Sequence, residues 1–211
     1  QRYFINEDLT SKQQLILPDD DLHHVKKGNA NINGDEIICI DNAGQVYYGE
    51  IEDIEIGFKL KLISGLKKYE LDVEITLVYA LPKGDKFELV LQKATELGVK
   101  RIVPIQTKRC VVKMDEQKFA KKSLVIKNIK RGAEQSWRNF IPEITNVIKL
   151  EQLDQYLGDH NLVAFEELAK QGEHMVQKQT LDQLSSGDKI TIVVGSEGGF
   201  ELDEIEMMNK L

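Results

Sequence analysis

The feature that most constrains this chain is a change of pattern at Lys67-Lys68. After this point, short apolar runs alternate with longer segments in which apolar residues recur at helical spacing. Strands that alternate with helices favour a parallel sheet covered by helices on both faces. We therefore expect an α/β domain over residues 69–211, with strands at residues 73–80, 101–105, 143–148, 162–165 and 189–194.

Helices are expected between these strands. Asp85 can cap a helix that runs to Leu97, and Gly98 follows it as a C-terminal cap. The remaining helices are predicted at residues 115–137, which include the helix-weakening Gly132, and at residues 151–157, 173–184 and 201–210.

The first 68 residues have a different pattern, with several short strand-like segments and one short helix. The strands are predicted at residues 2–6, 14–17, 36–41, 46–54 and 58–66, and the helix at residues 19–27 after Pro18. Asn42-Ala43-Gly44 is typical of a turn between two strands. Strands this short and closely spaced indicate a small β-barrel over residues 1–68.

The charge of the chain is unevenly distributed. The net charge is −7, but residues 100–138 hold twelve Lys and Arg and only three Asp and Glu, a charge of +9. The remaining residues carry −16. One concentrated basic segment is compatible with binding to phosphates through one face, and equally with a solvated helix surface.

Several classes of protein are excluded by simple counts. No segment approaches the roughly 20 apolar residues of a membrane helix, and no signal peptide precedes the first strand. The two cysteines, Cys39 and Cys110, lie far apart, and His23-His24 would point about 100° apart on a helix. We therefore expect no disulfide, no metal and no membrane contact, and a reducing cytoplasm as the location.

The segment Gly195-Ser196-Glu197-Gly198-Gly199-Phe200 lies between the last predicted strand and the last predicted helix. Ligands of α/β sheets bind beyond the carboxyl ends of the strands, and glycines let the backbone approach a ligand closely. The segment is neither a P-loop nor G-x-G-x-x-G, and the Glu197 carboxylate would repel a pyrophosphate. A carboxylate accepts hydrogen bonds from hydroxyls or an amine. The loop therefore favours a nucleoside without phosphates, such as S-adenosyl-L-methionine (SAM), over the alternative of a tight turn without a ligand.

The same loop, followed by Asp203-Glu204-Ile205, resembles the G-P-E-G-G-[FL] signature of SPOUT methyltransferases. More narrowly, the chain resembles the RsmE family, which forms N3-methyluridine in 16S ribosomal RNA. Further motifs agree in order along nearly the whole chain: Arg2-Tyr3-Phe4, His23-His24, Gly34-Asp35-Glu36, Leu81-Pro82-Lys83-Gly84-Asp85-Lys86, Lys93-Ala94-Thr95-Glu96-Leu97-Gly98-Val99, Thr107-Lys108-Arg109-Cys110 and Ala133-Glu134-Gln135-Ser136-Trp137-Arg138.

The resemblance implies a PUA-like barrel that binds RNA, a SPOUT domain with a C-terminal trefoil knot, and a homodimer with the SAM pocket near the subunit interface. It implies a substrate in the small ribosomal subunit. The implied cofactor residues are Phe165, Glu166, Gly195, Ser196, Glu197, Gly198, Gly199 and Phe200, although Phe165 could equally be a core aromatic.

Uridine N3 must lose its proton before it attacks the SAM methyl group. A cation near the uracil oxygens would stabilise the resulting anion. Arg138 and Arg109 are the candidates for this cation, with Arg138 favoured and phosphate binding as the alternative role. Glu134 could accept the proton or orient an arginine, or equally be an ordinary helix carboxylate paired with a basic residue. The expected RNA-binding residues are Arg2, Lys83, Lys108, Arg109 and Arg138. Trp137 could stack on a base or lie buried at an interface.

The sequence departs from the family in two places. Residues 27–32 lack an expected arginine, which affects RNA contact by the barrel. The family also ends in a Leu-Gly-x-Arg-Ile-Leu-Arg-x-Glu-Thr-Ala segment that completes the knot and the adenosine pocket, whereas this chain stops at Leu211. Either that segment is missing from this chain or it is disordered; we favour disorder and expect the structure to be free of SAM.

Three hypotheses follow. The first is a SAM-dependent methyltransferase that modifies N3 of a uridine in 16S rRNA. The second is a non-catalytic RNA-binding or ribosome-assembly protein, and a related alternative is a SPOUT enzyme that acts on another RNA. The third, a nucleotide-dependent enzyme of another class, is disfavoured by Glu197 and by the absence of phosphate-binding motifs.

Overall fold

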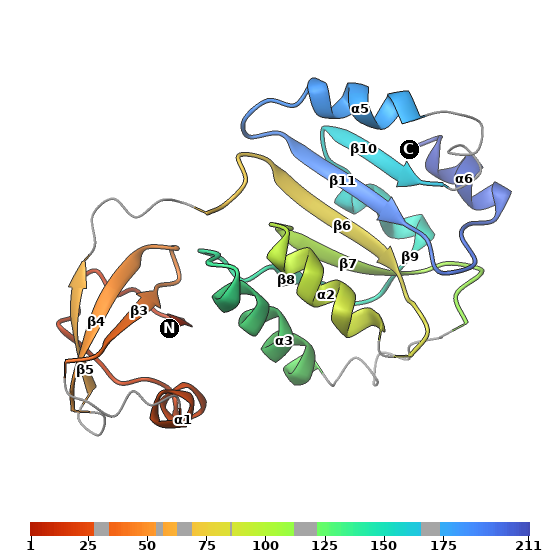
Figure 1. The fold of residues 1–211 in the computed structure, drawn as a ribbon. Coiled ribbons are helices and arrows are strands. Elements are labelled where there is room, and N and C mark those ends of the chain that lie inside the picture. The colour runs from red at the N-terminus through yellow and green to blue at the C-terminus, as the bar shows by residue number, and fades with distance from the viewer. Residues whose placement is uncertain (28–33, 54–56, 63–68, 85, 112–121, 166–173) are drawn as a thin grey trace. The chain divides into compact units, whose positions relative to one another are not determined.

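The structure is a computed structural model that describes residues 1–27, 34–53, 57–62, 69–84, 86–111, 122–165 and 174–211 (Figure 1). The chain forms two compact units. The first comprises Gln1–Glu70 together with Ala133–Ile141, and the second comprises Leu71–Gly132 together with Pro142–Leu211. Residues 69–70 and 133–141, which the sequence-based boundary assigns to the α/β domain, thus pack with the first unit.

The described residues of the first unit form a five-stranded sheet, the helix α1 (Asp19–Lys27), whose bounds match the prediction, and the last turn of a helix that ends at Gln135. The sheet has the order β1-β3-β4-β5-β2, in which β1 and β3 are parallel and the other neighbours antiparallel. Its strands are β1 (Arg2–Phe4), β2 (Gln14–Leu15), β3 (Glu36–Ile40), β4 (Val46–Asp53) and β5 (Gly57–Leu62). All five predicted strands are confirmed. β1, β2 and β3 end one or two residues before the predicted ends, β5 begins one residue before its predicted start, and the predicted ends of β4 and β5 lie outside the described residues. Among the described residues the sheet is open, with β1 and β2 at its two edges.

The core of this sheet comes from one side of each strand. Tyr3, Cys39, Tyr47 and Ile51 are buried, as alternation along a strand requires when one face of a sheet is covered. Burial raises the pKa of the Cys39 thiol to about 12. Cys39 therefore behaves as a small apolar side chain.

The second unit is built on a parallel sheet, as predicted. The order is β10-β11-β6-β7-β8, with β9 also paired to β7, and every pair is parallel. The strands are β6 (Glu74–Ala80), β7 (Arg101–Gln106), β8 (Glu143–Ile144), β9 (Ile148–Lys149), β10 (His160–Ala164) and β11 (Lys189–Val194). The bounds of β11 match the prediction, whereas the single strand predicted at residues 143–148 is two short strands.

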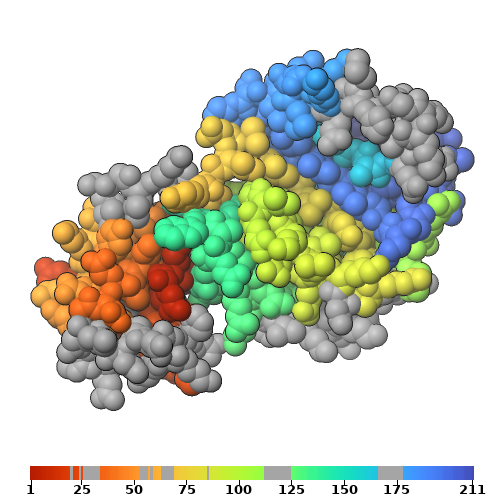
Figure 2. Space-filling view, viewed as in Figure 1, coloured from red at the N-terminus to blue at the C-terminus, as the bar shows by residue number. Residues whose placement is uncertain are grey.

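Helices cover the central strands of this sheet. α2 (Lys86–Glu96) lies in front of β6 and β7 in Figure 1, and the space-filling view from the same side shows it closing that face (Figure 2). Leu91 of α2 is fully buried, as are Val78 of β6 and Ile102 of β7. Burial of apolar area on this scale is the dominant contribution to the stability of the unit.

α2 ends in the way the sequence predicts. Gly98 has φ = +97°, and the N–H of Val99 donates to the carbonyl of Ala94 at 3.0 Å. This six-to-one bond with a left-handed glycine is the Schellman motif. Asp85, the predicted cap at the other end, lies outside the described residues.

α3 (Lys122–Gln135) continues through Gly132 without a break. A Cβ at Gly132 would lie 3.4 Å from the Cβ of Thr95 on α2, so the small residue allows the two helices to approach closely. The helix ends two residues before Trp137, the predicted end. The predicted start at Asp115 lies outside the described residues.

The other helices differ from prediction in type or length. Residues 150–156 form a 3₁₀ helix, η2 (Leu150–Tyr156), in place of the α-helix predicted at residues 151–157. α5 (His174–Asp182) and α6 (Leu202–Met208) are confirmed but shorter. The carboxylate of Glu204 accepts a hydrogen bond from the N–H of Glu201, which fixes the start of α6.

The segment Ala133–Ile141 contacts the predicted turn in the first unit. The carboxylate of Asp41 accepts hydrogen bonds from the N–H groups of Ala43 and Gln45, which confirms the turn. Gly44 has φ = +76°, and its carbonyl accepts a hydrogen bond from the amide of Asn139 at 3.2 Å. A Cβ at Gly44 would lie 2.5 Å from the ring of Phe140.

Substitution of Gly44 tests this packing. We expect Gly44→Ala to lower the free energy of unfolding by roughly 1–3 kcal/mol, because the methyl group adds a clash with the Phe140 ring to the strain of a positive φ. Gly34→Ala is the control, since Gly34 has φ = +101° but no atom of the described residues lies within 4 Å of the place that its Cβ would take. Equal losses in denaturant unfolding would mean that the contact with Phe140 contributes nothing.

Candidate functional site

The glycine loop, residues 195–200, follows the carboxyl end of β11 and leads into α6. The N–H of Gly199 donates to the carbonyl of Ser196 at 2.8 Å, and Gly199 has φ = +69°. A Cβ at Gly195 would lie 3.2 Å from the backbone of Gly199. Glycine at positions 195 and 199 thus permits a tight turn whose backbone lies at the edge of the sheet where ligands bind.

Arg109, from the segment after β7, holds one side of this loop. Its Nη1 donates to the carbonyl of Gly198 at 2.7 Å, and its Nε donates to the carboxylate of Glu201 at 2.8 Å. The hydrogen bond from Arg109 holds the pKa of Glu201 below its ordinary value. The loop is therefore tied to the segment after β7 by charge-assisted hydrogen bonds.

Glu197 lies on the other side of the loop. Its carboxylate accepts hydrogen bonds from the Lys86 ammonium at 3.0 Å and from the N–H of Lys83 at 3.4 Å. Its own backbone N–H, and then the Lys86 ammonium, hold the pKa of Glu197 below its ordinary value. Glu197 is thus an ionised hydrogen-bond acceptor at neutral pH, as the interpretation of the sequence requires.

The remaining predicted cofactor residues differ in exposure. Phe200 is buried, with 2% of its surface exposed, and it belongs to the core of the second unit. Phe165 packs against the same core and is partly exposed, while Glu166 lies outside the described residues. Ser196 has a buried hydroxyl with no hydrogen-bond partner among the described residues.

These features fit a nucleoside cofactor such as SAM. The loop offers a Ser196 hydroxyl that has no partner among the described residues, an ionised acceptor at Glu197, and glycine backbone that a ligand can approach. An orphaned buried polar group is unfavourable unless a ligand or water satisfies it. The residues present can therefore hold the cofactor that the sequence predicts.

Lys108 contacts α6 beside the loop. Its backbone N–H donates to the carboxylate of Glu204 at 2.8 Å, and its ammonium pairs with Asp203. This pair raises the pKa of Lys108 and lowers that of Asp203. Glu204 is 3% exposed, so its carboxylate serves as an internal acceptor.

A cavity of about 600 Å³ adjoins this contact, between the carboxyl ends of β7 and β9, the start of η2, and α6. Its lining residues are mostly polar: Gln106, Thr107, Lys108, Cys110, Lys149, Leu150, Glu151, Asp203, Glu204 and Met207. Sequence reasoning missed this cavity, and it missed Lys86, Glu201 and Glu204 as partners of the loop region. The Glu201–Glu204 spacing of a capping box is the signal that could have identified two of them.

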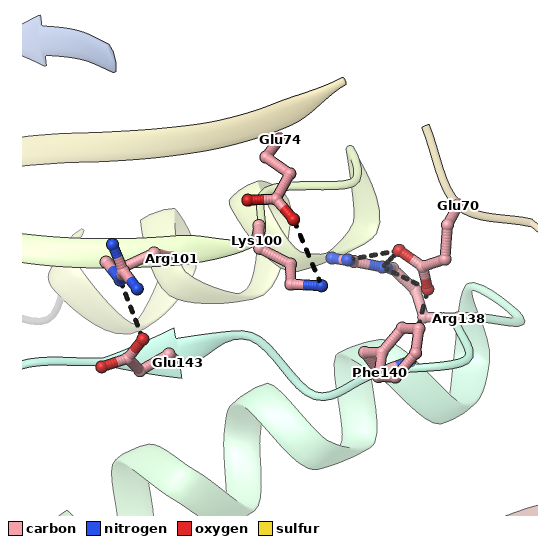
Figure 3. A network of polar contacts seen from close by, with 7 residues as sticks. All are labelled: Glu70, Glu74, Lys100, Arg101, Arg138, Phe140 and Glu143. Atoms are coloured by element: carbon pink, nitrogen blue, oxygen red, sulfur yellow. Dashed lines mark hydrogen bonds and ion pairs between the residues drawn. The ribbon is translucent and has the colours of Figure 1, made fainter. Parts of the chain in front are cut away.

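Arg138, the predicted catalytic cation, is 2% exposed and belongs to the first unit. Its Nη2 donates to the Glu70 carboxylate at 2.7 Å, and its Nε lies 3.1 Å from the same oxygen (Figure 3). The other oxygen of Glu70 accepts hydrogen bonds from the N–H groups of Asn139 and Phe140. Arg138 and Glu70 thus form a buried ion pair whose oxygens are well satisfied.

The other predicted residues of the first unit lie near its aromatic side chains. Arg2 is 7% exposed, and its guanidinium lies over the ring of Trp137, 5.2 Å from the centroid. Glu134 lies in the last turn of α3, and its charge adds to the effect of burial in raising the pKa of Tyr3. The structure therefore places Arg2, Glu134 and Arg138 in the first unit, and the glycine loop with Lys83, Lys108 and Arg109 in the second.

Three features are absent from the described part of the chain: a metal-binding cluster, a disulfide and a membrane-spanning helix. No group of three or more His, Cys, Asp or Glu residues there could hold a metal ion. Cys39 and Cys110 are both buried, and neither forms a disulfide. No helix of the described residues is long and apolar enough to cross a membrane.

Comparison with known proteins identifies the family. The model of an RNA methyltransferase domain matches residues 69–211. Ribosomal RNA small subunit methyltransferase E of Bacillus subtilis is 34% identical over 221 residues, which cover all of this chain and 85% of that protein. The chain belongs to the ribosomal RNA small subunit methyltransferase E family.

Further members and structures agree with this assignment. The family member of Rickettsia conorii is 28% identical, over 98% of this chain and 82% of that protein. The structure of a methyltransferase from Legionella pneumophila, solved with SAM bound, matches 99% of this chain and 85% of that one, with a TM-score of 0.78 and 26% identity. The RsmE resemblance inferred from the ordered motifs is thereby confirmed.

A substitution at Arg138 separates a structural role from a catalytic one. We expect Arg138→Met to lower the free energy of unfolding by about 3 kcal/mol or more, because Glu70 would keep a half-buried charge without its cation. Arg101→Met is the matched control, since the Arg101–Glu143 pair is exposed and contributes at most about 1 kcal/mol. Unchanged urea unfolding of Arg138→Met together with lost methyl transfer would instead assign Arg138 to catalysis.

Proposed function

We propose that this enzyme transfers a methyl group from SAM to N3 of a uridine in 16S rRNA of the small ribosomal subunit. The observation that carries the proposal is the glycine loop at the carboxyl end of β11, held by Arg109 on one side and by Lys86 on the other. The resemblance of this loop to the SPOUT signature implies that it binds the cofactor. SAM supplies an electrophilic methyl group there, and no phosphate-binding element is needed.

The cofactor would be held mainly by backbone and by short polar side chains. Gly195, Gly198 and Gly199 leave room for close approach of the ligand, and the carboxylate of Glu197 accepts hydrogen bonds from hydroxyls or an amine. Within the described part of the chain the Ser196 hydroxyl forms no hydrogen bond, so it could bind the cofactor. Phe165 and Glu166 follow the adjacent strand β10 and complete the proposed set, while buried Phe200 supports the loop from the core.

The enzyme must hold uridine N3 near the methyl group and promote loss of its proton. A guanidinium stabilises the uracil anion electrostatically, and the sequence assigns this role to Arg138 with Glu134 beside it. Both assignments stay predictions. In the structure the Arg138 guanidinium is covered and bound to Glu70, so a catalytic role for Arg138 requires this pair to open.

RNA contact is proposed for Arg2, Lys83, Lys108, Arg109 and Arg138. Lys83 is exposed, which suits a phosphate contact. Lys108 and Arg109 each bind a carboxylate of α6 or its N-terminal flank, so phosphates would compete with Asp203 and Glu201 for them. We therefore assign Arg109 mainly to positioning of the glycine loop.

The finer architecture is proposed from the family resemblance. The five-stranded sheet of the first unit is compatible with a PUA-like barrel, and the parallel sheet of the second unit with a SPOUT domain that ends in a trefoil knot. A homodimer and a cytoplasmic location follow from the same resemblance, and a substrate that is part of the ribosome supports that location.

The test is methyl transfer from labelled SAM to small ribosomal subunits that lack the modification, followed by nucleoside analysis of the RNA. We expect label in N3-methyluridine of 16S rRNA. Gly195→Ala should reduce the rate by about tenfold or more, because its methyl group would push against the backbone of Gly199.

Other outcomes distinguish the alternatives. Label at a ribose 2′-hydroxyl, or only in transfer RNA, would refute the proposed substrate while leaving a methyltransferase. Binding to small subunits without any transfer of label would favour a non-catalytic assembly protein.

A further inference from the structure

Two helices of this chain end in the same backbone motif with very different residues. Gly98, two residues after the end of α2, has φ = +97°, and Trp137, two residues after the end of α3, has φ = +62°. The N–H of Arg138 donates to the carbonyl of Ala133 at 3.0 Å, as that of Val99 does to Ala94. Position 137 thus occupies the site of a Schellman motif where glycine is usual.

Tryptophan is a poor residue for this backbone conformation. The left-handed region brings Cβ close to the following carbonyl oxygen, and only glycine, and to a lesser degree asparagine and aspartate, adopts it readily. Trp137 is the one residue other than glycine with a positive φ among the described residues. Such an outlier is a reason to look for a function of the side chain.

Packing does not account for the indole ring. Trp137 is 49% exposed, so about half of a large apolar side chain faces solvent. A residue retained for the core would be buried, as Phe200 and Tyr3 are. The ring is instead presented at the surface of the first unit.

Two neighbours fix the orientation of the ring. The guanidinium of Arg2 lies over it at 5.2 Å from the centroid, in the range of a cation–π interaction. The ring of Tyr69 lies 6.0 Å away, tilted by 59°, and is itself 49% exposed. The indole is therefore held by a buried cation and extended by a second exposed aromatic ring.

Two charged residues adjoin the aromatic pair, because Glu70 follows Tyr69 in the chain and Arg2 lies over the indole. Glu70 is adjacent in sequence to Tyr69, but its carboxylate is consumed by Arg138 and by the N–H groups of Asn139 and Phe140. Arg2 adds a positive charge directly against the indole. The surface offers π-faces backed by a cation, which is the chemistry that stacks on a nucleobase.

We propose that Trp137, extended by Tyr69, stacks on an unpaired base of the RNA substrate. This inference rests on the proposed function in taking RNA as the ligand, and it assigns one contact of the first unit to a base and not to a phosphate. Two exposed rings match the area of one or two bases and are far smaller than the roughly 800 Å² that each partner contributes to a stable protein–protein interface.

The chain allows a direct test because Trp137 is its only tryptophan. A single-stranded RNA oligonucleotide should quench the intrinsic tryptophan emission when it is titrated into the protein. Fluorescence anisotropy of a labelled copy of the same RNA measures binding in parallel, and the two titrations should have the same midpoint. An abasic oligonucleotide of equal length should bind without this quenching. Binding of RNA without quenching, equal quenching by the abasic strand, or no binding by the wild-type protein would each overturn the inference.

Substitution separates stacking from stability. Trp137→Gly should weaken RNA binding about tenfold, the size expected for loss of one base–aromatic stack, without lowering the midpoint of thermal unfolding, because glycine suits the backbone at this position. Trp137→Phe should retain most of the affinity. A Trp137→Gly variant with wild-type affinity, or one whose loss is not restored by phenylalanine, would contradict the proposal.

The kinetics of methyl transfer test the stacking contact independently. With unmodified small subunits as substrate, Trp137→Gly should raise KM about tenfold and leave kcat and the affinity for SAM unchanged. If neither the wild type nor Trp137→Gly transfers a methyl group but RNA still quenches Trp137 in the wild type, the proposed function fails and the stacking contact stands. If the wild type is active and Trp137→Gly has an unchanged KM, the stacking contact fails alone.

Discussion

The hydrogen bonds of Arg109 to Gly198 and Glu201 are the contacts on which the candidate site depends most. They join segments about ninety residues apart in sequence, because β7 and β11 are parallel strands of one sheet and end at the same edge. A glycine-rich loop without such contacts would have to be ordered by its ligand, at a considerable entropic cost. Arg109, with Lys86 and Glu197 on the other side, reduces that cost before any cofactor binds.

The positive charge of residues 100–138 is partly neutralised by ion pairs within the protein. Residues 100–138 carry +9, which by itself is compatible with a phosphate-binding face or a solvated surface. Five of their basic side chains form ion pairs with carboxylates outside the segment: Lys100 with Glu74, Arg101 with Glu143, Lys108 with Asp203, Arg109 with Glu201, and Arg138 with Glu70. Part of the positive charge is therefore neutralised within the protein, and the acidic remainder of the chain supplies the partners.

The sequence predicted those features of the fold that depend on residues close together in the chain. The parallel sheet follows from alternating strands and helices, the bounds of β11 from one uninterrupted apolar run, and the Gly98 cap from a glycine after a periodic segment. The glycine loop could be placed because the end of a strand is visible in the sequence. Glu197 limited the choice of ligand by its charge alone.

Contacts between distant residues could not be predicted in the same way. A basic residue has the same local pattern whether its partner is a phosphate or a carboxylate, so nothing near Arg138 indicates Glu70, which is 68 residues away. For the same reason the sequence did not reveal that residues 133–141 pack with the first unit, or that Trp137 stands where a helix normally ends in glycine.

The central claim is that the loop at the end of β11 binds SAM, and calorimetric titration of the full-length protein with SAM tests it most directly. We predict saturable binding with one SAM per chain, and affinity reduced about tenfold or more by Arg109→Ala, which removes the contacts to Gly198 and Glu201. Lys93→Ala removes the exposed ion pair between Lys93 and Glu96, which lies elsewhere on α2, and this variant should bind SAM as the wild type does. Absence of binding at millimolar SAM, or equal affinity of the Arg109→Ala variant, would contradict the account.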